Sequence, residues 1–460
     1  MSMTAHMPDT FYWGNSSSSM QTEGAVSLDG KGPSVYDLKQ AGPNTTDWQV
    51  AIDDYHRYEE DLDLMQAMHM NMYRLQISWS RVVPDGDGAF NEAGIAYYDR
   101  VIDACLARKI TPMVCLYHFD IPLALAKKYN GFMSRHTVDA FVRFGQAMIT
   151  HFQDRVKYWL VFNEHNLYFT DEAFNISGYV DGQRTLGEMY QIFHHTMLAH
   201  ARLDAFVHEQ YSDVKIGGML AYTPIYPKDA DPKTIFAARQ LDEFLNNNLN
   251  SAYVHGHYSP EVWRFISSTQ LTFDWQPEDA VVLAHQHADF IAFSYYRSAV
   301  VDANKIPAGT PVNRYLAHSF EANEFLPQTQ WGWAIDPLGL RNVITKLYDQ
   351  YQVPVFPVEN GIGCRETWDG QHEIDDIARI DYHRAHIQAM QAAMFEDGAK
   401  VLGYLGWGLI DIPSSHGDME KRYGAVYVNR GNHDLRDLRR VPKRSFKWFQ
   451  QVFGSNGEEL

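Results

Sequence analysis

The chain has 460 residues, of which 45% are hydrophobic, and a formal net charge of -18 at pH 7. The apolar fraction is ample for a large core, and the acidic balance argues against nucleic acid and anionic membrane surfaces as partners. Three cysteines without metal-binding spacing indicate a reducing compartment, so we expect a cytoplasmic protein. Residues 1–6 lack the basic and apolar regions of a signal peptide, and no apolar run is long enough to span a bilayer.

Eight short apolar runs, each ending in polar or aromatic residues, predict β-strands. They cover residues 11–15, 71–78, 110–118, 156–164, 215–222, 289–296, 353–360 and 401–409. Helical patterns lie between them, at residues 52–69, 92–107, 137–152, 186–211, 234–254, 277–287, 337–351 and 375–395. Eight alternating units favour an α/β fold whose parallel strands close into a (β/α)8 TIM barrel over an open sheet. We expect a single domain over residues 1–460.

The connection between the sixth and seventh predicted strands, residues 297–330, is long, polar and aperiodic. Loops of this length in a compact domain are usually functional. Active sites of such barrels lie at the carboxyl ends of the strands. We therefore expect this loop to overhang the mouth of the barrel at that end.

Two of the predicted strands end in a carboxylate. The strand at 156–164 ends in Asn163-Glu164, and the strand at 353–360 ends in Glu359-Asn360. In a barrel these carboxylates project into the same mouth from opposite sides. Glycoside hydrolysis needs such a pair, one protonated to help the leaving oxygen depart and one ionised to meet the oxocarbenium-like carbon. Either glutamate alone could equally form a structural ion pair with an arginine, but matching strand ends make that interpretation weaker for both together.

Other predicted strand ends supply accessory groups. Arg74 could keep a carboxylate ionised, form a structural ion pair, or do both. His118 could donate to a sugar hydroxyl or be a buried core histidine, and Tyr296 could bond a carboxylate or simply be an aromatic at a strand end. Trp407 offers a flat face for a pyranose ring, although indoles are also common in barrel cores.

Five motifs occur in the order typical of one known family. They are residues 11–25, Tyr-Arg-Leu-Gln-Ile-Ser-Trp-Ser-Arg at 73–81, Tyr-His-Phe-Asp at 117–120, Phe-Asn-Glu at 162–164 and Val-Glu-Asn-Gly at 358–361. Over nearly its whole length the chain resembles glycoside hydrolase family 1, the β-glucosidase family. The resemblance implies a cofactor-free retaining glycosidase with Glu164 as acid/base and Glu359 as nucleophile. It further implies Arg74 and Tyr296 as supports of the nucleophile, and Gln21, His118, Asn163 and Trp407 as sugar ligands.

The chain departs from the family pattern at several places. His165 stands where members often have Pro, Phe119 where they often have Trp, and Ser294 where many have Asn. None of these changes removes a reactive group, so we expect them to affect substrate fit more than chemistry. We expect Trp333 to line the aglycone side.

The most informative departure follows Trp407. Sugar-hydrolysing members carry a Glu-Trp pair there that grips the outer sugar hydroxyls, and this chain has Ser414 and Ser415 instead. A carboxylate would repel a phosphate, whereas a hydroxyl can donate to one. With Lys421 and Tyr423, the stretch resembles the 6-phospho-β-glycosidase subgroup, whose phosphate site uses Ser, Lys and Tyr. The alternative is that Lys421 and Arg422 are only a solvated charge pair.

The expected function is therefore retaining hydrolysis of a small-molecule 6-phospho-β-glucoside, with glucose favoured over galactose because Ser415 is small. The rivals are an unphosphorylated β-glucosidase, a 6-phospho-β-galactosidase and a non-catalytic sugar-phosphate binding protein. The 21 histidines show no His-Glu-x-x-His spacing, so we expect no metal site. The oligomeric state is left open, with a homo-oligomer among the alternatives.

Overall fold

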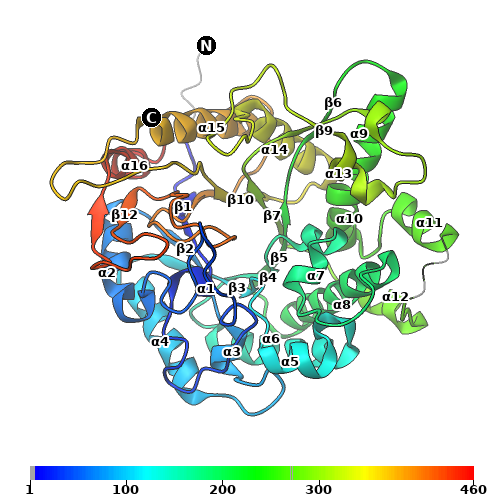
Figure 1. Cartoon of the computed structure of the whole chain (residues 1–460), viewed down its shortest axis with the longest axis horizontal. Helices are drawn as coiled ribbons and strands as arrows, with labels where there is room; N and C mark the ends of the chain where they lie inside the picture. Colours follow the sequence, from blue (N-terminus) through cyan, green and yellow to red (C-terminus); the bar gives the residue numbers. More distant parts are fainter. Residues whose placement is uncertain (1–5, 270, 272) are drawn as a thin grey trace.

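Eight parallel strands form a closed barrel in the order β1-β11-β10-β7-β5-β4-β3-β2 (Figure 1). The computed structural model describes residues 6–269, 271 and 273–460, so most of the segment searched for a signal peptide lies outside the described residues. The barrel strands are β1 (Tyr12–Ser16), β2 (Met72–Gln76), β3 (Thr111–Tyr117), β4 (Tyr158–Phe162), β5 (Lys215–Ala221), β7 (Phe290–Tyr295), β10 (Val355–Asn360) and β11 (Gly403–Trp407). Each overlaps one predicted strand, and the predicted (β/α)8 fold is confirmed.

Helices surround the strands as an outer ring (Figure 1). The main ones are α2 (Asp54–Ala67), α4 (Glu92–Ala107), α6 (Arg135–Phe152), α8 (Leu186–Gln210), α9 (Pro232–Asp242), α10 (Asn248–His255), α12 (Pro277–Ala284), α14 (Pro337–Tyr351), α15 (Ile377–Phe395) and α16 (Arg444–Gly454). None of the helices in the described part of the chain is both long and apolar enough to cross a membrane.

The helix predicted over residues 234–254 is present over its whole length, but it is not a regular α-helix throughout. The structure divides it into α9, a π-helical turn at Glu243–Asn247 (η3) and α10. Asparagines occupy residues 246–248, and Asn246 donates 2.9 Å to the Asp242 carboxylate. Such short polar side chains compete for local hydrogen bonds and weaken a regular helix.

The barrel interior is filled by inward-facing apolar side chains. They include Met72, Met113, Leu160, Met219, Phe290, Phe356, Val358 and Leu405, all of them fully buried. A packed interior of this kind leaves space only at the ends of the strands. The functional groups at the carboxyl ends of the strands therefore lie directly above a tightly packed apolar core.

The segment at 297–330 has more regular structure than its aperiodic sequence indicates. Its strand β8 (Ala299–Val301) pairs in parallel with β6 (Ile225–Pro227) and antiparallel with β9 (Phe320–Glu321), and α13 (Tyr315–Ser319) lies between β8 and β9. Strands of two or three residues are too short to give a periodic signal.

Candidate active site

Glu359 stands at the end of β10, buried beneath the barrel mouth. The register of β10 against β7 shifts between Pro357 and Glu359, which marks a bulge just before the carboxylate. Bulges of this kind re-aim a side chain next to active sites. Arg74, fully buried on β2, donates to Oε1 of Glu359, and the Tyr296 hydroxyl donates 2.9 Å to Oε2. Each carboxylate oxygen of Glu359 thus accepts a hydrogen bond. The predicted contacts of Arg74 and Tyr296 with Glu359 are present.

Glu164 follows β4 and has a left-handed backbone conformation, with φ of 43°. Such a conformation is uncommon for a residue other than glycine and often occurs at functional sites. Ser294, on β7, donates 2.5 Å to Oε1 of Glu164. Burial, followed by the negative charge of Glu359, raises the pKa of Glu164 to about 7, while Ser294 and Arg74 oppose the rise. The pKa of Glu359 is also raised by burial, but Arg74 and Tyr296 counteract it directly.

Both glutamates line one cavity of about 320 Å³ at the mouth. A second cavity, of about 280 Å³, lies beside it, and the two share Glu164, Tyr296 and Trp333 as lining residues. Glu359 lines only the first cavity, which we call the sugar cavity. The second, which we call the outer cavity, is lined by residues just beyond Glu164 and by residues from the segments 221–223, 245–246, 294–297 and 316. Glu164 therefore stands at the boundary between two binding spaces.

Most of the predicted sugar ligands line the sugar cavity. His118, Asn163 and Trp407 are among its walls, and the rings of His118 and Trp407 lie nearly parallel with centroids 5.5 Å apart. Asn163 accepts 2.6 Å from Arg74, which fixes its amide. Burial lowers the pKa of His118 well below its usual value, and its Nδ1 has no partner among the described residues.

Gln21 is the exception among these ligands. It is fully buried, accepts 2.5 Å from Ser18 and donates 2.8 Å to the carbonyl of Pro413. It is not a lining residue of either cavity. The structure therefore places Gln21 behind the wall, where it supports the segment that leads into Ser414, and its predicted contact with sugar is untested.

The predicted phosphate residues gather at one corner of the sugar cavity. Lys421, Tyr423 and Ser414 all line it, and Nζ of Lys421 lies 3.6 Å from the ring centroid of Trp333. A Cβ at Gly363 would lie 2.7 Å from Cγ of Lys421, so only glycine lets the lysine side chain lie along this path. The ammonium makes no ion pair with any residue that the structure describes.

Ser414 and Tyr423 line the same corner of the sugar cavity as Lys421, whereas Arg422 does not. Ser414 accepts 3.1 Å from the backbone of Asp418 and has no acceptor for its own proton within the described ranges. Burial raises the pKa of Tyr423, so its phenol keeps its proton. Arg422 points away and bonds Asp411 and carbonyl groups at 2.6–3.0 Å, because successive side chains of an extended segment alternate in direction.

Several residues at the site could not be singled out from the sequence. Ser294 departs from the family pattern, but nothing in the sequence indicates its hydrogen bond to Glu164. His165, another departure, is buried and bonds Tyr253 and Thr196 at 2.7 and 2.8 Å, which anchors the turn after Glu164. Asp418 and the exposed His416 also line the sugar cavity. Arg297 lines the outer cavity.

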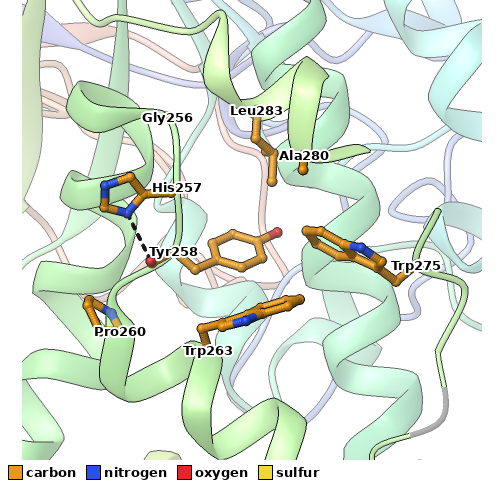
Figure 2. Close-up of a pocket in the computed structure, with 8 residues that line it drawn as sticks. All are labelled: Gly256, His257, Tyr258, Pro260, Trp263, Trp275, Ala280 and Leu283. Carbon is orange, nitrogen blue, oxygen red and sulfur yellow. Dashed lines mark hydrogen bonds between the residues drawn. The ribbon is translucent and has the colours of Figure 1, made fainter. Parts of the chain in front are cut away.

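A cavity of about 370 Å³ lies outside the barrel, between α11 (Pro260–Ser268), the turn before it, and α12 (Figure 2). Tyr258, Trp263 and Trp275 line it with mostly apolar neighbours, and no carboxylate is among its lining residues. It has no acid or base arrangement comparable with that of Glu164 and Glu359.

One group of side chains is close enough to hold a cation. Ligand atoms of Asp204, His208 and His287 lie within 4.8 Å of one another. However, His208 bonds Asp204 at 3.2 Å and Asp289 at 3.1 Å, and these bonds raise the pKa of the ring to about 9. A protonated imidazole has no lone pair for a metal, so this group, in which His287 is exposed, is better described as a partly buried ionic cluster.

A closed barrel of eight parallel strands, with two carboxyl groups facing one cavity at its carboxyl end, defines a (β/α)8 glycosidase. The sequence matches Glycosyl hydrolase family 1 over residues 3–458, and the chain belongs to that family.

Its relatives carry more specific names. The chain is 37% identical to the aryl-phospho-beta-D-glucosidase BglA of Bacillus subtilis (strain 168), over 99% of this chain and 100% of that protein. It is 35% identical to the 6-phospho-beta-glucosidase of Clostridium longisporum, with 100% of each chain covered. Among solved structures, the beta-glucosidase of Thermotoga maritima with castanospermine is similar, with a TM-score of 0.87 at 30% identity over 98% of this chain and 99% of that one.

Proposed function

We propose that this enzyme hydrolyses 6-phospho-β-glucosides with retention of configuration, and that Lys421 marks the phosphate site. The observation that carries the proposal is the unpaired ammonium of Lys421 at the wall of the cavity that contains Glu164 and Glu359. In a chain with a net charge of -18, a buried cation that has no carboxylate partner among the described residues is best explained by an anionic ligand. The names of the relatives agree with a phosphorylated substrate.

The two glutamates would divide the chemistry between them. Arg74 and Tyr296 both bond Glu359, which favours its ionised form as the nucleophile. Burial and the charge of Glu359 raise the pKa of Glu164 to about 7, so a large share of the resting enzyme holds Glu164 protonated at neutral pH and can give that proton to the leaving oxygen. Attack by Glu359 on the anomeric carbon then forms a glycosyl-enzyme intermediate as the aglycone departs.

The second step follows from the same electrostatics. Once Glu359 is esterified it no longer carries a negative charge. Because that charge raises the pKa of Glu164, the pKa of Glu164 falls at this stage. Glu164, now a carboxylate, takes a proton from the water that attacks the anomeric carbon. The bond between that carbon and Glu359 breaks in the same step, which frees Glu359 as a carboxylate and leaves Glu164 protonated for the next cycle. The retaining route requires the two carboxyl groups to lie about 5 Å apart.

The 6-phosphate would be held by Lys421, Tyr423 and Ser414. Burial, and then the charge of Arg297, lower the pKa of Lys421 to about 8, so the ammonium remains the main form at neutral pH. A bound phosphate would raise that pKa again. Tyr423 and Ser414 each have a hydroxyl proton to donate. His118, Asn163 and Trp407 would contact the sugar ring, and the small, exposed Ser415 leaves room that favours glucose over galactose.

A cytoplasmic location also belongs to this proposal, because it fits three cysteines that are all free and a phosphorylated substrate. The direct test compares turnover of 4-nitrophenyl β-glucoside with and without a 6-phosphate by the purified protein. We expect a much higher kcat/KM for the phosphorylated form. Equal or higher values for the plain glucoside would favour the unphosphorylated β-glucosidase instead, and no release of nitrophenol from either would leave only a binding protein.

A further inference from the structure

Arg297 is a second cation at the mouth, directly after Tyr296. Its guanidinium carbon lies 5.1 Å from the ring centroid of Trp333 and 5.9 Å from that of Phe320. The side chain is half-buried, and burial lowers its pKa. No carboxylate comes within ion-pair distance of it in the described parts of the chain. The charge of Arg297 is therefore held between two aromatic rings and left uncompensated.

Arg297 and Lys421 serve different spaces. Trp333 lines both cavities, whereas Lys421 lines only the sugar cavity and Arg297 only the outer cavity. Both cations lie against the indole of Trp333, and the charge of Arg297 is one of the causes that lower the pKa of Lys421. Two like charges kept so near each other destabilise the empty site. An anion on the sugar side balances Lys421 but leaves the outer cavity positive.

The other groups of the outer cavity do not neutralise Arg297. Its single carboxyl group is Glu164, and its other lining residues with a polar side chain that carries no charge at neutral pH are Asn166, Thr170, Tyr222, Thr223, Asn246, Ser294 and Tyr296. Glu164 is the group that must be protonated when the substrate binds, so it contributes little negative charge at that stage. In the proposed reaction Glu164 protonates the leaving oxygen, and Glu359 does not line this cavity, so the outer cavity is the space that the aglycone would occupy.

We propose that Arg297 is a specificity-determining residue that binds an anionic substituent, such as a carboxylate, on the leaving group. The proposal rests on the proposed function, since it assigns the leaving-group half of the same substrate. A guanidinium offers a planar pair of N–H donors that matches a carboxylate, and the rings of Trp333 and Phe320 hold that plane in place. The preferred substrates would carry two anions, one on the sugar and one on the aglycone.

The test uses two aryl 6-phospho-β-glucosides that differ only at the remote end of the ring, 4-carboxyphenyl and 4-carbamoylphenyl. The ratio of their kcat/KM values is measured in the wild type and in Arg297→Met. Comparing the two ratios cancels the difference in leaving-group ability, as in a double-mutant cycle. We expect Arg297→Met to lower the carboxylate-to-carbamoyl ratio on the order of 10-fold, the usual size for loss of one charge-assisted hydrogen bond. Arg297→Lys should restore part of it.

Arg314→Met is the matched control, because Arg314 lies in the same loop but its charge is balanced by Asp171 at 2.6 Å. That variant should leave the ratio unchanged. An unchanged ratio in Arg297→Met would overturn the proposal. This includes the outcome in which kcat/KM falls by the same factor for both substrates, which would indicate that Arg297 holds the 6-phosphate. The preference for phosphorylated over plain 4-nitrophenyl glucoside, measured in parallel, tests the proposed function separately.

Discussion

The hydroxyl of Ser294 donates a 2.5 Å hydrogen bond to Oε1 of Glu164, across the barrel mouth from β7 to the end of β4. This bond favours the ionised form of Glu164, whereas burial and Glu359 favour the protonated form. The pKa of about 7 is the balance of these effects. Ser294 therefore adjusts the proton affinity of the proposed acid without itself reacting.

Removing that hydroxyl should change the pH dependence in a definite direction. In Ser294→Ala the ionised form of Glu164 loses a donor, so its pKa should rise above about 7. Because the protonated form is the one that acts first, the basic limb of kcat/KM should move to higher pH. Ser298→Ala is a matched control, since Ser298 is buried nearby and its hydroxyl has no partner in the described structure. A basic limb that stays in place, or moves down, contradicts this role.

Substitution of each glutamate should give a different pattern of loss. Glu359→Gln should abolish turnover of every glycoside, because no nucleophile remains. Glu164→Gln should mainly harm substrates with poor leaving groups, since an activated phenolate needs little protonation to depart. Initial rates on 4-nitrophenyl and unactivated alkyl 6-phospho-β-glucosides separate the two. Equal damage by Glu164→Gln on both substrates would contradict its role as the acid. An α-anomer as the first product by proton NMR would contradict double displacement.

Arg74→Met should damage both the nucleophile and the fold. Without the cation the pKa of Glu359 rises, so the acidic limb of kcat/KM should move to higher pH. Leaving one partner of a buried ion pair unmatched costs about 3–5 kcal/mol. Arg81→Met is the control, because Arg81 and Glu23 form an equally buried pair outside both cavities. Arg81→Met should lose similar stability in urea titrations but keep the pH profile of kcat/KM. A shift of that profile in both variants would show that the effect of Arg74→Met is only structural.

Gly363→Ala tests the path of the Lys421 side chain without touching its charge. The new Cβ would come 2.7 Å from Cγ and 2.9 Å from Cε of Lys421, so the ammonium must move. We expect KM for a phosphorylated substrate to rise roughly 10-fold, as for a lost charge-assisted hydrogen bond, with little change for the plain glucoside. Gly431→Ala is the comparison, since its nearest contact would be 3.4 Å. If KM is unchanged in Gly363→Ala, the present position of Lys421 is not the one used for phosphate.

The sequence predicted the barrel well because each strand is an apolar run that ends in polar or aromatic residues. Glu164 and Glu359 could be paired from their strand ends alone, and the structure places them on one cavity. The sequence left open that Lys421 and Arg422 are a solvated charge pair, whereas in the structure Lys421 lines the cavity and Arg422 is buried and bonded to Asp411. Confinement of the whole chain to one domain stays a prediction.

What the sequence could not show are contacts that only the closed barrel creates. Ser294 and Glu164 are 130 positions apart, and their bond exists because β7 and β4 curve toward the same mouth. Gln21 carries the family's motif, yet its amide is occupied by Ser18 and Pro413 behind the wall. Arg297 stands in a stretch without periodicity, so nothing in the pattern distinguished it from a solvated loop arginine.

The central claim, that Lys421 holds the 6-phosphate, is tested most directly by Lys421→Ala. The measurement is kcat/KM for 4-nitrophenyl β-glucoside with and without the 6-phosphate. A charge-assisted hydrogen bond contributes roughly 1.5–3 kcal/mol, so the value for the phosphorylated substrate should fall about 10- to 100-fold. The value for the plain glucoside should stay the same or rise slightly, because the ammonium no longer has to be desolvated without an anion. An equal fall on both substrates would contradict the account and make Lys421 a structural residue.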